Sequence, residues 1–407
     1  MKNTDATPFH RQAHWLALAR IPQLTSTELR ALLSRWPDPE AILDADLDQL
    51  AEAGVSKETW NYLRKKGLSV VAKDVEWLQQ PGHHLLTLTD ADYPSHLREI
   101  PDPPPLLFVR GDPAILAYPQ IAMVGSRNPT PMGREIASAF AKELAEMGFV
   151  ITSGLAIGID GAAHRGTLSV GGPTIAVVGT GLDRIYPARH RELGLEIIKT
   201  GACVSEFFLG TPPLAVNFPQ RNRIISGLSL GVLVVEATTR SGSLITARLA
   251  GEQGREVFAI PGSIHNPLAR GCHMLLRQGA KLVESASDVI EELGPQEFTV
   301  VSRQIIDNKS ERDSSTQGLT SSTSPSQVPG KKSTAANPAV DGINREFDLD
   351  TEYRILLDNL GFEQTPIDVL VERTGWTVEV LSSMLLTLEL RGFVSSIPGG
   401  GYTRSVS

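Results

Sequence analysis

Residues 120–133 read QIAMVGSRNPTPMG, a stretch in which an apolar run, a glycine-containing turn and the start of a helix follow one another directly. Ile121–Val124 is short and wholly apolar, which is typical of a strand covered on both faces. Residues 125–127 form the turn, and Gly133–Met147 has the spacing of an amphipathic helix. This succession of strand, turn and helix predicts one unit of a parallel α/β sheet.

The same unit recurs along residues 85–295. We expect further strands at Phe149–Thr152, Thr174–Val178, Gly231–Val235 and Glu256–Ile260, and helices at Gly161–Ser169 and Ser243–Gln253. Apolar strands that alternate with helices require cover on both faces of the sheet. The predicted fold class is therefore α/β, with a doubly wound, mostly parallel sheet.

The regions on either side of this domain differ from it in pattern. Residues 9–80 predict a small all-α module, with short helices at Trp15–Arg20, Glu28–Trp36, Pro39–Asp44, Leu47–Ala53 and Glu58–Lys66. Residues 305–345 are rich in Ser, Thr, Pro and Gly and poor in aliphatic residues, which predicts a flexible linker. Residues 347–407 predict three helices and a hairpin, the outline of a winged-helix domain.

Charge is distributed unevenly along the chain. The 407 residues carry a formal charge of -8, which at first sight argues against a polyanion as partner. Residues 1–120 hold 12 Lys+Arg and 16 Asp+Glu, residues 121–283 hold 16 and 11, and residues 284–407 hold 10 and 19. Only the α/β region is basic, and it is the region in which we expect an anionic ligand to bind.

Composition excludes several classes of protein and suggests a compartment. The amino-acid usage is not that of a collagen-like, fully disordered or histone-like chain. Cys203 and Cys272 have neither CxxC spacing nor metal-like His neighbours, so we expect no disulfide framework and no metal. The first residues lack the apolar segment of a signal peptide, and no run reaches the length of a membrane span. We expect a cytoplasmic protein without a membrane partner.

Four loops share the chemistry of phosphate binding. In an open α/β sheet, ligands bind beyond the carboxyl ends of the strands, where glycines, hydroxyls and helix N-termini favour anions. The first loop is residues 125–127 (GSR), and the second is residues 153–160 (SGLAIGID). The third is residues 238–243 (TTRSGS), and the fourth, residues 217–223 (NFPQRNR), combines an aromatic ring with two arginines. An aromatic ring beside arginines suits base stacking with neutralisation of the backbone.

Other pairings of polar residues allow alternative interpretations. Asp160 and His164 could form a general acid/base pair, but no nucleophile motif accompanies them, and we favour a structural role. Glu206 and Glu236, at strand ends, could form a carboxylate pair or salt bridges to nearby arginines. Residues 179–184 lack the third glycine of a dinucleotide fingerprint, and no GxxxxGK[ST] motif exists. The sequence therefore predicts no cofactor.

Long motifs in this chain resemble those of the DprA/Smf family, the DNA-processing proteins of bacterial natural transformation. The motifs are GSRNPTPMG (125–133), SGLAIGIDGAAHRG (153–166), FPQRNRIISGLS (218–229), EATTRSGSLITA (236–247), and FAIPG with GCHMLLRQGAKLV (258–262 and 271–283). The resemblance implies an N-terminal module like a sterile alpha motif or a helix-hairpin-helix, an extended Rossmann core and a C-terminal winged helix.

The resemblance also implies a function and a set of site residues. It implies a homodimeric protein without catalytic activity that binds and protects single-stranded DNA (ssDNA). It further implies that the RecA recombinase is loaded onto DNA coated with single-strand-binding protein (SSB). The residues that would contact DNA are Gly125, Ser126, Arg127, Ser153, Gly154, Phe218, Arg221, Asn222, Arg223, Ser241, Gly242 and Ser243. For the dimer interface we expect Met274, Leu275 and Leu276, because this stretch is strongly apolar.

The chain departs from the family pattern at three places. Met132 occupies a position where the family often has tyrosine, and Ala215 and Val216 stand where some members carry lysine. The N-terminal region lacks the Gly-x-Gly hairpin of DNA-binding helix-hairpin-helix motifs. Because this region is also acidic, we expect it to serve in interaction or as a scaffold.

Two other functions remain open at the level of the sequence. One is a Rossmann-like enzyme that hydrolyses nucleoside monophosphates in the manner of a phosphoribohydrolase. Its PGGxGTxxE signature is absent, and TTRSGSLITA stands in the corresponding region. The other is a transcription regulator whose core senses a nucleotide. Against it, residues 377–390 contain no Lys or Arg, so this helix of the winged-helix region is poorly suited to read DNA.

Overall fold

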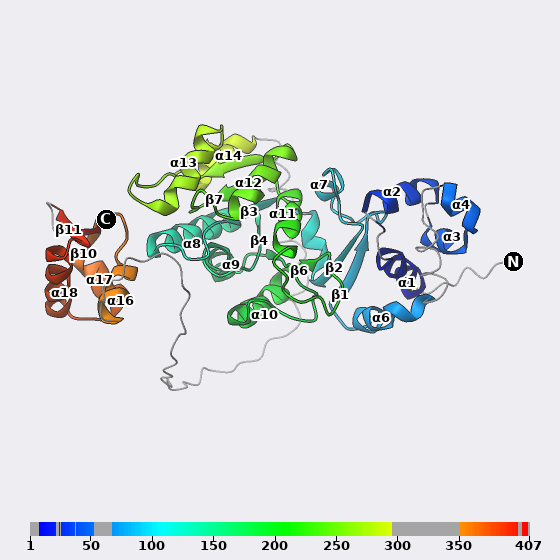
Figure 1. Cartoon of the computed structure of the whole chain (residues 1–407), viewed down its shortest axis with the longest axis horizontal. Coiled ribbons are helices and arrows are strands. Elements are labelled where there is room, and N and C mark those ends of the chain that lie inside the picture. The colour runs from blue at the N-terminus through cyan, green and yellow to red at the C-terminus, as the bar shows by residue number, and fades with distance from the viewer. Residues whose placement is uncertain are drawn as a thin grey trace, which may run out of the picture. The chain divides into compact units, whose positions relative to one another are not determined.

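The computed structural model describes residues 8–21, 24, 26–36, 38–52, 67–294, 351–397 and 401–405. The chain divides into two compact units, residues 1–302 and 303–407. The first unit contains a nine-stranded sheet with helices on both of its faces (Figure 1), and the second is a small domain of helices and short strands. The expected linker at 305–345 lies outside the described residues.

The nine strands form one mixed sheet. Their order is β1-β2-β6-β5-β4-β3-β7-β8-β9. The pairs β1/β2 and β2/β6 are antiparallel, and every other neighbouring pair is parallel. The strands are β1(His83–Thr87), β2(Leu106–Gly111), β3(Gln120–Val124), β4(Val150–Ser153), β5(Thr174–Val177), β6(Ala202–Ser205), β7(Gly231–Val234), β8(Glu256–Ala259) and β9(Lys281–Leu282).

Strand order reverses between β3 and β7. From β3 the chain moves outward through β4, β5 and β6, and it then returns to place β7 on the other side of β3. Such a reversal leaves a crevice beyond the carboxyl ends of the two central strands, because their following loops diverge to opposite faces. The predicted doubly wound, mostly parallel sheet is confirmed, whereas β1, β2, β6 and β9 were not anticipated.

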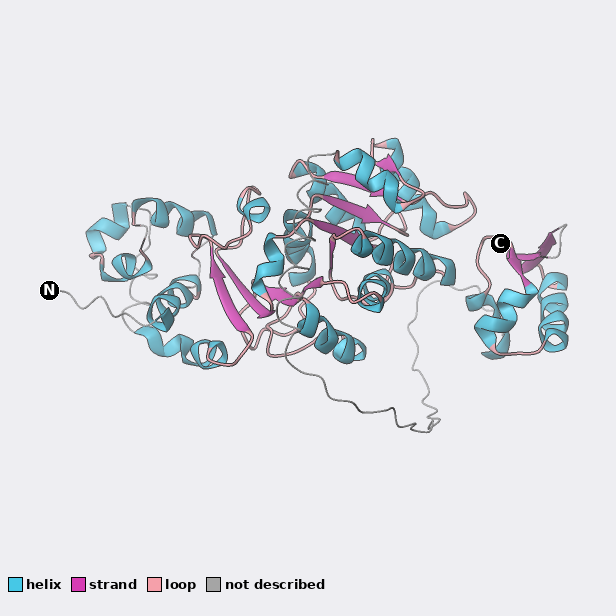
Figure 2. Cartoon of the chain, turned by 180° about the vertical axis from the view of Figure 1, so that it is seen from behind, coloured by secondary structure: helices cyan, strands magenta, loops and turns pink. Residues whose placement is uncertain are grey.

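Helices cover the sheet in two layers (Figure 2). Side chains of α11, α12 and α13 share a core with Ala122, Val124 and Val232. Because side chains alternate along a strand, Ile121 and Met123 face the opposite side, where α8 and α9 lie against each other. The helices of this region are α7(Ser95–Arg98), α8(Pro131–Glu146), α9(Ile159–Ser169), α10(Arg191–Thr200), α11(Asn217–Leu228), α12(Ser243–Glu252), α13(Arg270–Arg277) and α14(Ala286–Leu293).

The N-terminal region is helical and shares a hydrophobic core with the sheet. Its helices are α1(Pro8–Ala19), α2(Ser26–Arg35), α3(Pro39–Asp44), α4(Leu47–Glu52) and α6(Ala72–Leu78), with a 3-10 turn at Gly67–Val71. The expected helix at 58–66 lies outside the described residues. Trp15 and Trp77 belong to the same cluster as Phe108 of β2 and Ile197 of α10. The helices are therefore packed against the sheet through side chains.

One buried ion pair joins α6 to the end of α1. Arg20 Nη2 lies 2.7 Å from Asp74 Oδ2, and the Asp74 side chain is fully buried. The same guanidinium stacks 4.2 Å from the ring centre of Phe208. Burial raises the pKa of Asp74, and the charge and hydrogen bonds of Arg20 oppose that rise. Arg20 therefore compensates a carboxylate that would otherwise be costly to bury.

The second unit is a winged-helix domain, as expected. It contains α16(Thr351–Asn359), α17(Ile367–Thr374), α18(Val378–Leu390) and a small sheet in the order β10-β12-β11. The strands are β10(Thr365–Pro366), β11(Val394–Ile397) and β12(Gly401–Arg404). Leucines of α16, α17 and α18 form its core, whereas Leu386 and Leu390 on α18 are exposed. The exposed face of α18 thus carries leucines and Glu379 and no basic residue.

Arg20→Ala should lower the free energy of unfolding by about 2–3 kcal/mol, because it leaves Asp74 buried without its charge partner. Arg35→Ala is the matched control, since the pair Arg35–Glu52 is solvent-exposed and should change the free energy by less than about 1 kcal/mol. Urea unfolding followed by tryptophan fluorescence measures both. Equal effects of the two substitutions would contradict the conclusion that Arg20 compensates the buried charge of Asp74.

Candidate nucleic-acid site

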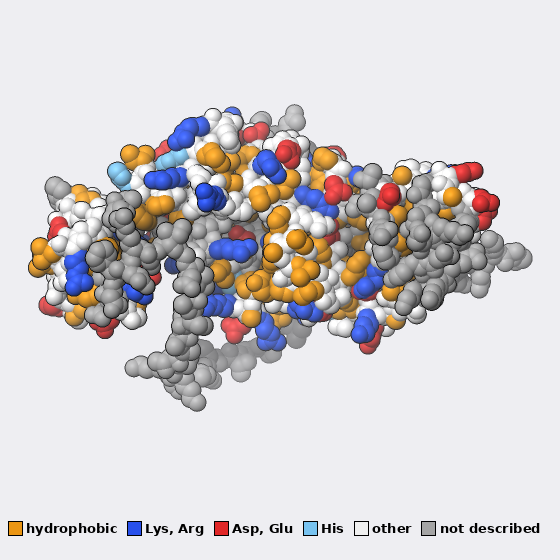
Figure 3. Space-filling model, in the orientation of Figure 1, with side chains coloured by type: hydrophobic (Ala, Val, Ile, Leu, Met, Phe, Trp, Pro, Cys, Tyr) orange, Lys and Arg blue, Asp and Glu red, His pale blue; other side chains and the backbone are white. Residues whose placement is uncertain are grey.

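A cavity of about 540 Å³ lies beyond the carboxyl ends of β3 and β7, at the point where strand order reverses. All four loops singled out in the sequence contribute to it, the second loop through Ala156 and Asp160. Nine of the twelve residues that the resemblance assigns to DNA line it: Gly125, Ser126, Arg127, Phe218, Arg221, Asn222, Ser241, Gly242 and Ser243. Lys and Arg side chains are spread over the α/β region on the face shown in Figure 3.

The first loop brings an arginine to the mouth of the cavity. Gly125 has no room for a side chain, because a Cβ there would lie 2.6 Å from Ile159 and 2.9 Å from the Glu236 carbonyl. The Ser126 N–H donates to that same carbonyl at 2.7 Å, which fixes the turn. Arg127 is exposed, and its guanidinium carbon lies 5.7 Å from the ring centre of Phe218. This arrangement places a cation beside an aromatic surface.

Helix α11 supplies the aromatic ring of Phe218, and Asn217 anchors the start of the helix. Phe218 is half-buried against Gly179, and its ring centre lies 5.9 Å from that of Tyr186. Asn217 Nδ2 donates to the Gly179 carbonyl at 3.0 Å and anchors the start of the helix. Tyr186, which is 44% exposed, was missed in the sequence because it belongs to none of the four loops. Phe218 thus lines the cavity, and the Tyr186 ring lies beside it outside the lining.

Arg221 is a buried cation in the wall of the cavity. It is only 4% exposed, and its Nη1 donates to the Val177 carbonyl at the end of β5. Burial lowers its pKa to about 10, an effect that the charge of Asp160 opposes. The guanidinium is therefore charged at neutral pH. Within the described part of the chain its Nε has no hydrogen-bond partner. A buried, charged and incompletely bonded guanidinium favours an anionic ligand.

The second loop places the carboxylate of Asp160 near the Arg221 guanidinium. Asp160 Oδ2 accepts hydrogen bonds from Gly154 N at 3.1 Å and Ala156 N at 3.3 Å. Burial raises the pKa of Asp160, whereas Arg221 and these N–H groups lower it. His164 hydrogen bonds through Nδ1 to Thr174 Oγ1 at 2.8 Å, and burial lowers its pKa to about 3. This geometry favours the structural role expected for Asp160 and His164 over an acid/base pair.

The third loop contributes hydroxyl groups at the start of α12. Ser241 Oγ and Ser243 Oγ lie 2.7 Å apart, and Ser243 N donates to Ser241 Oγ at 3.3 Å. Around Gly242, no atom lies within 4 Å of the position a Cβ would take. The N-terminus of this ten-residue helix therefore presents hydroxyls and backbone to the cavity.

Three residues expected to contact DNA lie behind this wall. Ser153 is buried and donates through Oγ to the Met123 carbonyl at 2.5 Å. At Gly154 a Cβ would lie 2.2 Å from Arg221 Nη1, so this glycine makes space for the guanidinium. Arg223 is bound by Glu206 and Asp102. The polar groups of all three are engaged within the protein, and none of the three lines the cavity.

The two glutamates at strand ends do not form a pair. Glu236 accepts hydrogen bonds from Thr130 Oγ1 at 2.7 Å, Thr130 N at 2.9 Å and Asn266 Nδ2 at 3.3 Å. Its carboxylate also lies against Gly133, at the start of α8. Glu206 instead forms a salt bridge with Arg223. Both carboxylates therefore hold the scaffold together.

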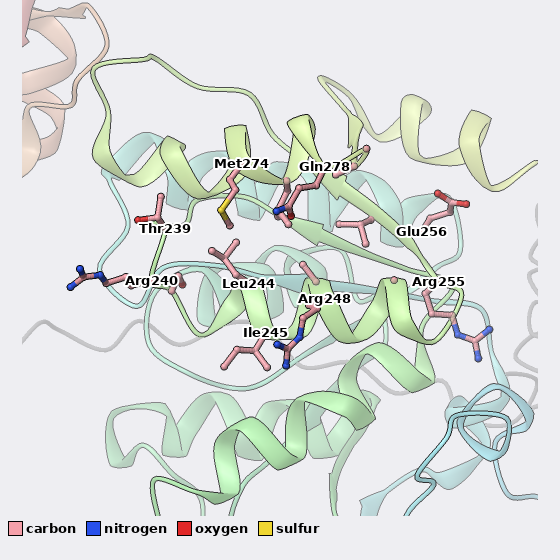
Figure 4. Close-up of a pocket in the computed structure, with 16 residues that line it drawn as sticks. Thr239, Arg240, Leu244, Ile245, Arg248, Arg255, Glu256, Met274 and Gln278 are labelled. Atoms are coloured by element: carbon pink, nitrogen blue, oxygen red, sulfur yellow. The ribbon is translucent and has the colours of Figure 1, made fainter.

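A second cavity, of about 670 Å³, lies between α12 and α13 (Figure 4). Met274 and Leu244 face each other across it, and Arg240 and Arg248 lie at its edge. Of the residues expected at a dimer interface, Leu275 is 6% exposed and belongs to the core, and Leu276 packs partly against that core. Met274 is thus the residue of the three best placed to meet a partner.

Clusters of metal-ligating residues and membrane-spanning helices are both absent from the described residues. Across those residues, no group of three or more His, Cys, Asp and Glu side chains could hold a metal ion. None of the helices described is both long and apolar enough to cross a bilayer. Cys203 and Cys272 are free and buried.

The fold defines a class: a Rossmann-like protein with a winged-helix domain and a cavity at the strand-order reversal. Residues 84–294 match the family described as DNA recombination-mediator protein A, and residues 344–400 match the DprA winged helix domain. The chain belongs to the DNA recombination-mediator protein A (DprA/Smf) family.

Individual relatives are similar to this chain over most of its length. Protein Smf of Escherichia coli is 41% identical over 391 residues, which is 95% of this chain and 94% of that protein. DNA processing protein DprA of Bacillus subtilis is 41% identical over 286 residues, covering 68% of this chain and 94% of the relative. The X-ray structure of DNA processing protein A from Streptococcus pneumoniae has a TM-score of 0.62 and 37% identity, and it covers 70% of this chain and 98% of its own.

Gly154→Ala should lower the free energy of unfolding by about 1–3 kcal/mol, because the new methyl group would overlap the guanidinium of Arg221. The control is Gly251→Ala, at a helical position with open space around it, which should be neutral or slightly stabilising. Thermal unfolding of both variants measures the difference. A neutral result for Gly154→Ala would show that Arg221 is not confined as described.

Proposed function

We propose that this protein binds single-stranded DNA in the cavity at the strand-order reversal, protects it, and loads RecA onto it. The proposal rests chiefly on the cavity, where buried Arg221, exposed Arg127 and the Phe218 ring lie close together. Family membership supports a role in recombination. The proposal includes displacement of SSB, a cytoplasmic location and no catalytic activity of the protein's own.

Single strands suit this cavity better than duplex DNA. The faces of unpaired bases are open to stacking, whereas those of a duplex are covered by neighbouring base pairs. Phe218 is half-buried, and Arg127 lies beside it, so a ligand must bring a flat group close to the wall. Arg221 and the start of α12 then provide donors for one or two phosphate groups.

Self-association is part of the proposal. The cavity between α12 and α13 is lined in part by apolar side chains, among them Met274, Leu244 and Ile245. Ile264 and Leu282 are exposed apolar residues on the adjoining segments. A second copy of the chain that covers this face would remove these groups from water. Two copies would also offer two ssDNA cavities to one strand, which raises the effective affinity.

The alternative functions have less support in the structure. A phosphoribohydrolase would need a carboxylate free to act on substrate, but Glu236 accepts three hydrogen bonds from the scaffold and Glu206 is paired with Arg223. A regulator that reads duplex DNA would need basic residues on α18, and this helix has none. We therefore retain ssDNA binding as the function.

Arg127→Ala should lower the affinity for a single-stranded oligonucleotide about tenfold, because it removes one phosphate contact and one cation beside the stacked base. The slope of log affinity against log salt should become shallower by about 0.7, the value for one phosphate on a single strand. Fluorescence titration over a salt series measures both, and wild-type protein should prefer single strands to duplex.

Arg191→Ala is the matched control, since it removes an exposed arginine at the start of α10 that lines neither this cavity nor the one between α12 and α13. It should leave affinity within about twofold of wild type. RecA filament assembly on SSB-coated ssDNA should fail with Arg127→Ala and proceed with Arg191→Ala. Preference for duplex DNA, or equal loss in the two variants, would contradict the proposal.

A further inference from the structure

Arg223 lies two residues after Arg221 on α11, but its side chain has a different environment. Its Nη1 and Nη2 each donate to one carboxylate oxygen of Glu206, both at 2.7 Å. Its Nε donates to Asp102 Oδ2 at 3.1 Å, and Nη1 also donates to the Gln220 carbonyl at 3.2 Å. Two residues along a helix correspond to a rotation of about 200°, which separates Arg223 from the cavity-facing side.

These contacts leave Arg223 little capacity for a phosphate. The residue is 8% exposed, and its guanidinium is held by two carboxylates. Burial alone would lower its pKa, but the hydrogen bonds and charges of Glu206 and Asp102 raise it. A phosphate that approached this arginine would have to displace a bidentate carboxylate and would meet a second one.

The partners of Arg223 belong to two separate segments of the fold. Glu206 follows directly after β6, and Asp102 lies in the proline-rich segment between α7 and β2. That segment is itself fixed, because the buried Tyr93 hydroxyl donates to the Pro104 carbonyl at 2.7 Å. Helix α11 approaches this segment closely, since a Cβ on Gly227 would lie 3.0 Å from Ile100 and 2.8 Å from Leu97 of α7. Arg223 thus ties α11 to the sheet and to this segment together.

We propose that Arg223 is a positioning residue, held by Glu206 and Asp102, that orients α11 so that Phe218, Arg221 and Asn222 face the cavity. The inference rests on the proposed function, because its readout is ssDNA binding. Arg223 itself makes no contact with DNA. Its charge serves the scaffold, whereas Arg221 and Arg127 are the arginines that line the cavity.

The same anchor connects α11 to the N-terminal helices. Arg30 of α2 donates through Nη1 to the Pro101 carbonyl at 3.0 Å, and its Nη2 lies 3.9 Å from Asp102 Oδ1. Asp102 therefore lies between an arginine of α2 and an arginine of α11. Through this contact the N-terminal region supports the ssDNA cavity without providing DNA ligands, which gives that acidic region a scaffold role.

The test compares Arg223→Gln with Arg127→Ala in ssDNA titrations over a salt series, together with hydrogen exchange of α11 amides. Arg223→Gln should weaken binding at least about tenfold, leave the salt slope unchanged within about 0.3, and accelerate exchange in α11. Arg127→Ala should reduce the slope by about 0.7 and leave exchange in α11 unchanged. A slope reduced equally by Arg223→Gln would make Arg223 a phosphate ligand and overturn the inference.

The effect of Glu206→Ala on ssDNA affinity distinguishes the two roles of Arg223, because a DNA ligand and a positioning residue predict changes of opposite sign. If Arg223 were a DNA ligand, removal of Glu206 would free its guanidinium and strengthen binding. If Arg223 positions α11, loss of Glu206 removes its main partner and allows α11 to move. Binding of ssDNA should then weaken by at least about threefold. Glu252→Ala removes an exposed carboxylate from α12 and controls for the change in net charge. Tighter binding by Glu206→Ala alone would overturn the inference.

Asp102→Ala keeps the test decisive if the other variants fail to fold, because the Asp102 side chain is 51% exposed and its loss should be tolerated. Faster exchange in α11 with weaker ssDNA binding supports the inference, and unchanged exchange with tighter binding overturns it. Wild-type protein that does not bind ssDNA would instead contradict the proposed function. The two failures are therefore distinguishable.

Discussion

A charged guanidinium buried at the carboxyl ends of the central strands is the constraint on which the site depends. Arg221 can remain there because the Val177 carbonyl accepts one of its hydrogen bonds and Asp160 provides an opposing charge. Gly154 leaves it space, and Asp160 in turn fixes the loop that carries Gly154. Burial without full hydrogen bonding is costly, and an anion in the adjoining cavity would relieve that cost.

The division of charge along the chain has a consistent physical meaning. Residues 121–283 carry an excess of five positive charges, and the structure shows which of the cationic side chains remain available to a ligand. Arg127 is exposed beside an aromatic ring, whereas Arg223 is compensated by carboxylates. The acidic regions contribute packing and apolar surface instead of positive charge. The N-terminal helices pack against the sheet, and α18 exposes leucines. The excess of positive charge is therefore confined to residues 121–283, the part of the sequence that lines the cavity.

Much of the fold and part of the site could be predicted from the sequence. Strong apolar periodicity identified five strands, and glycine-rich turns after them identified the loops that converge on the cavity. Short strands such as β6 lack that signal, and the core shared by Trp15 and Phe108 depends on packing between distant segments. Sequence also could not distinguish Arg221 from Arg223, because their roles depend on the rotation of α11 relative to the sheet. Tyr186 was missed because it lies outside the four loops and meets Phe218 only in the folded structure.

The central claim is that the cavity at the strand-order reversal holds a single strand with Arg221 as its fixed cation. A crystal structure of the protein with a short oligothymidylate tests this most directly. The account predicts a phosphate oxygen within about 3 Å of the Arg221 guanidinium and a base against Phe218. A strand bound instead along the cavity between α12 and α13, with Arg221 unchanged, would contradict it.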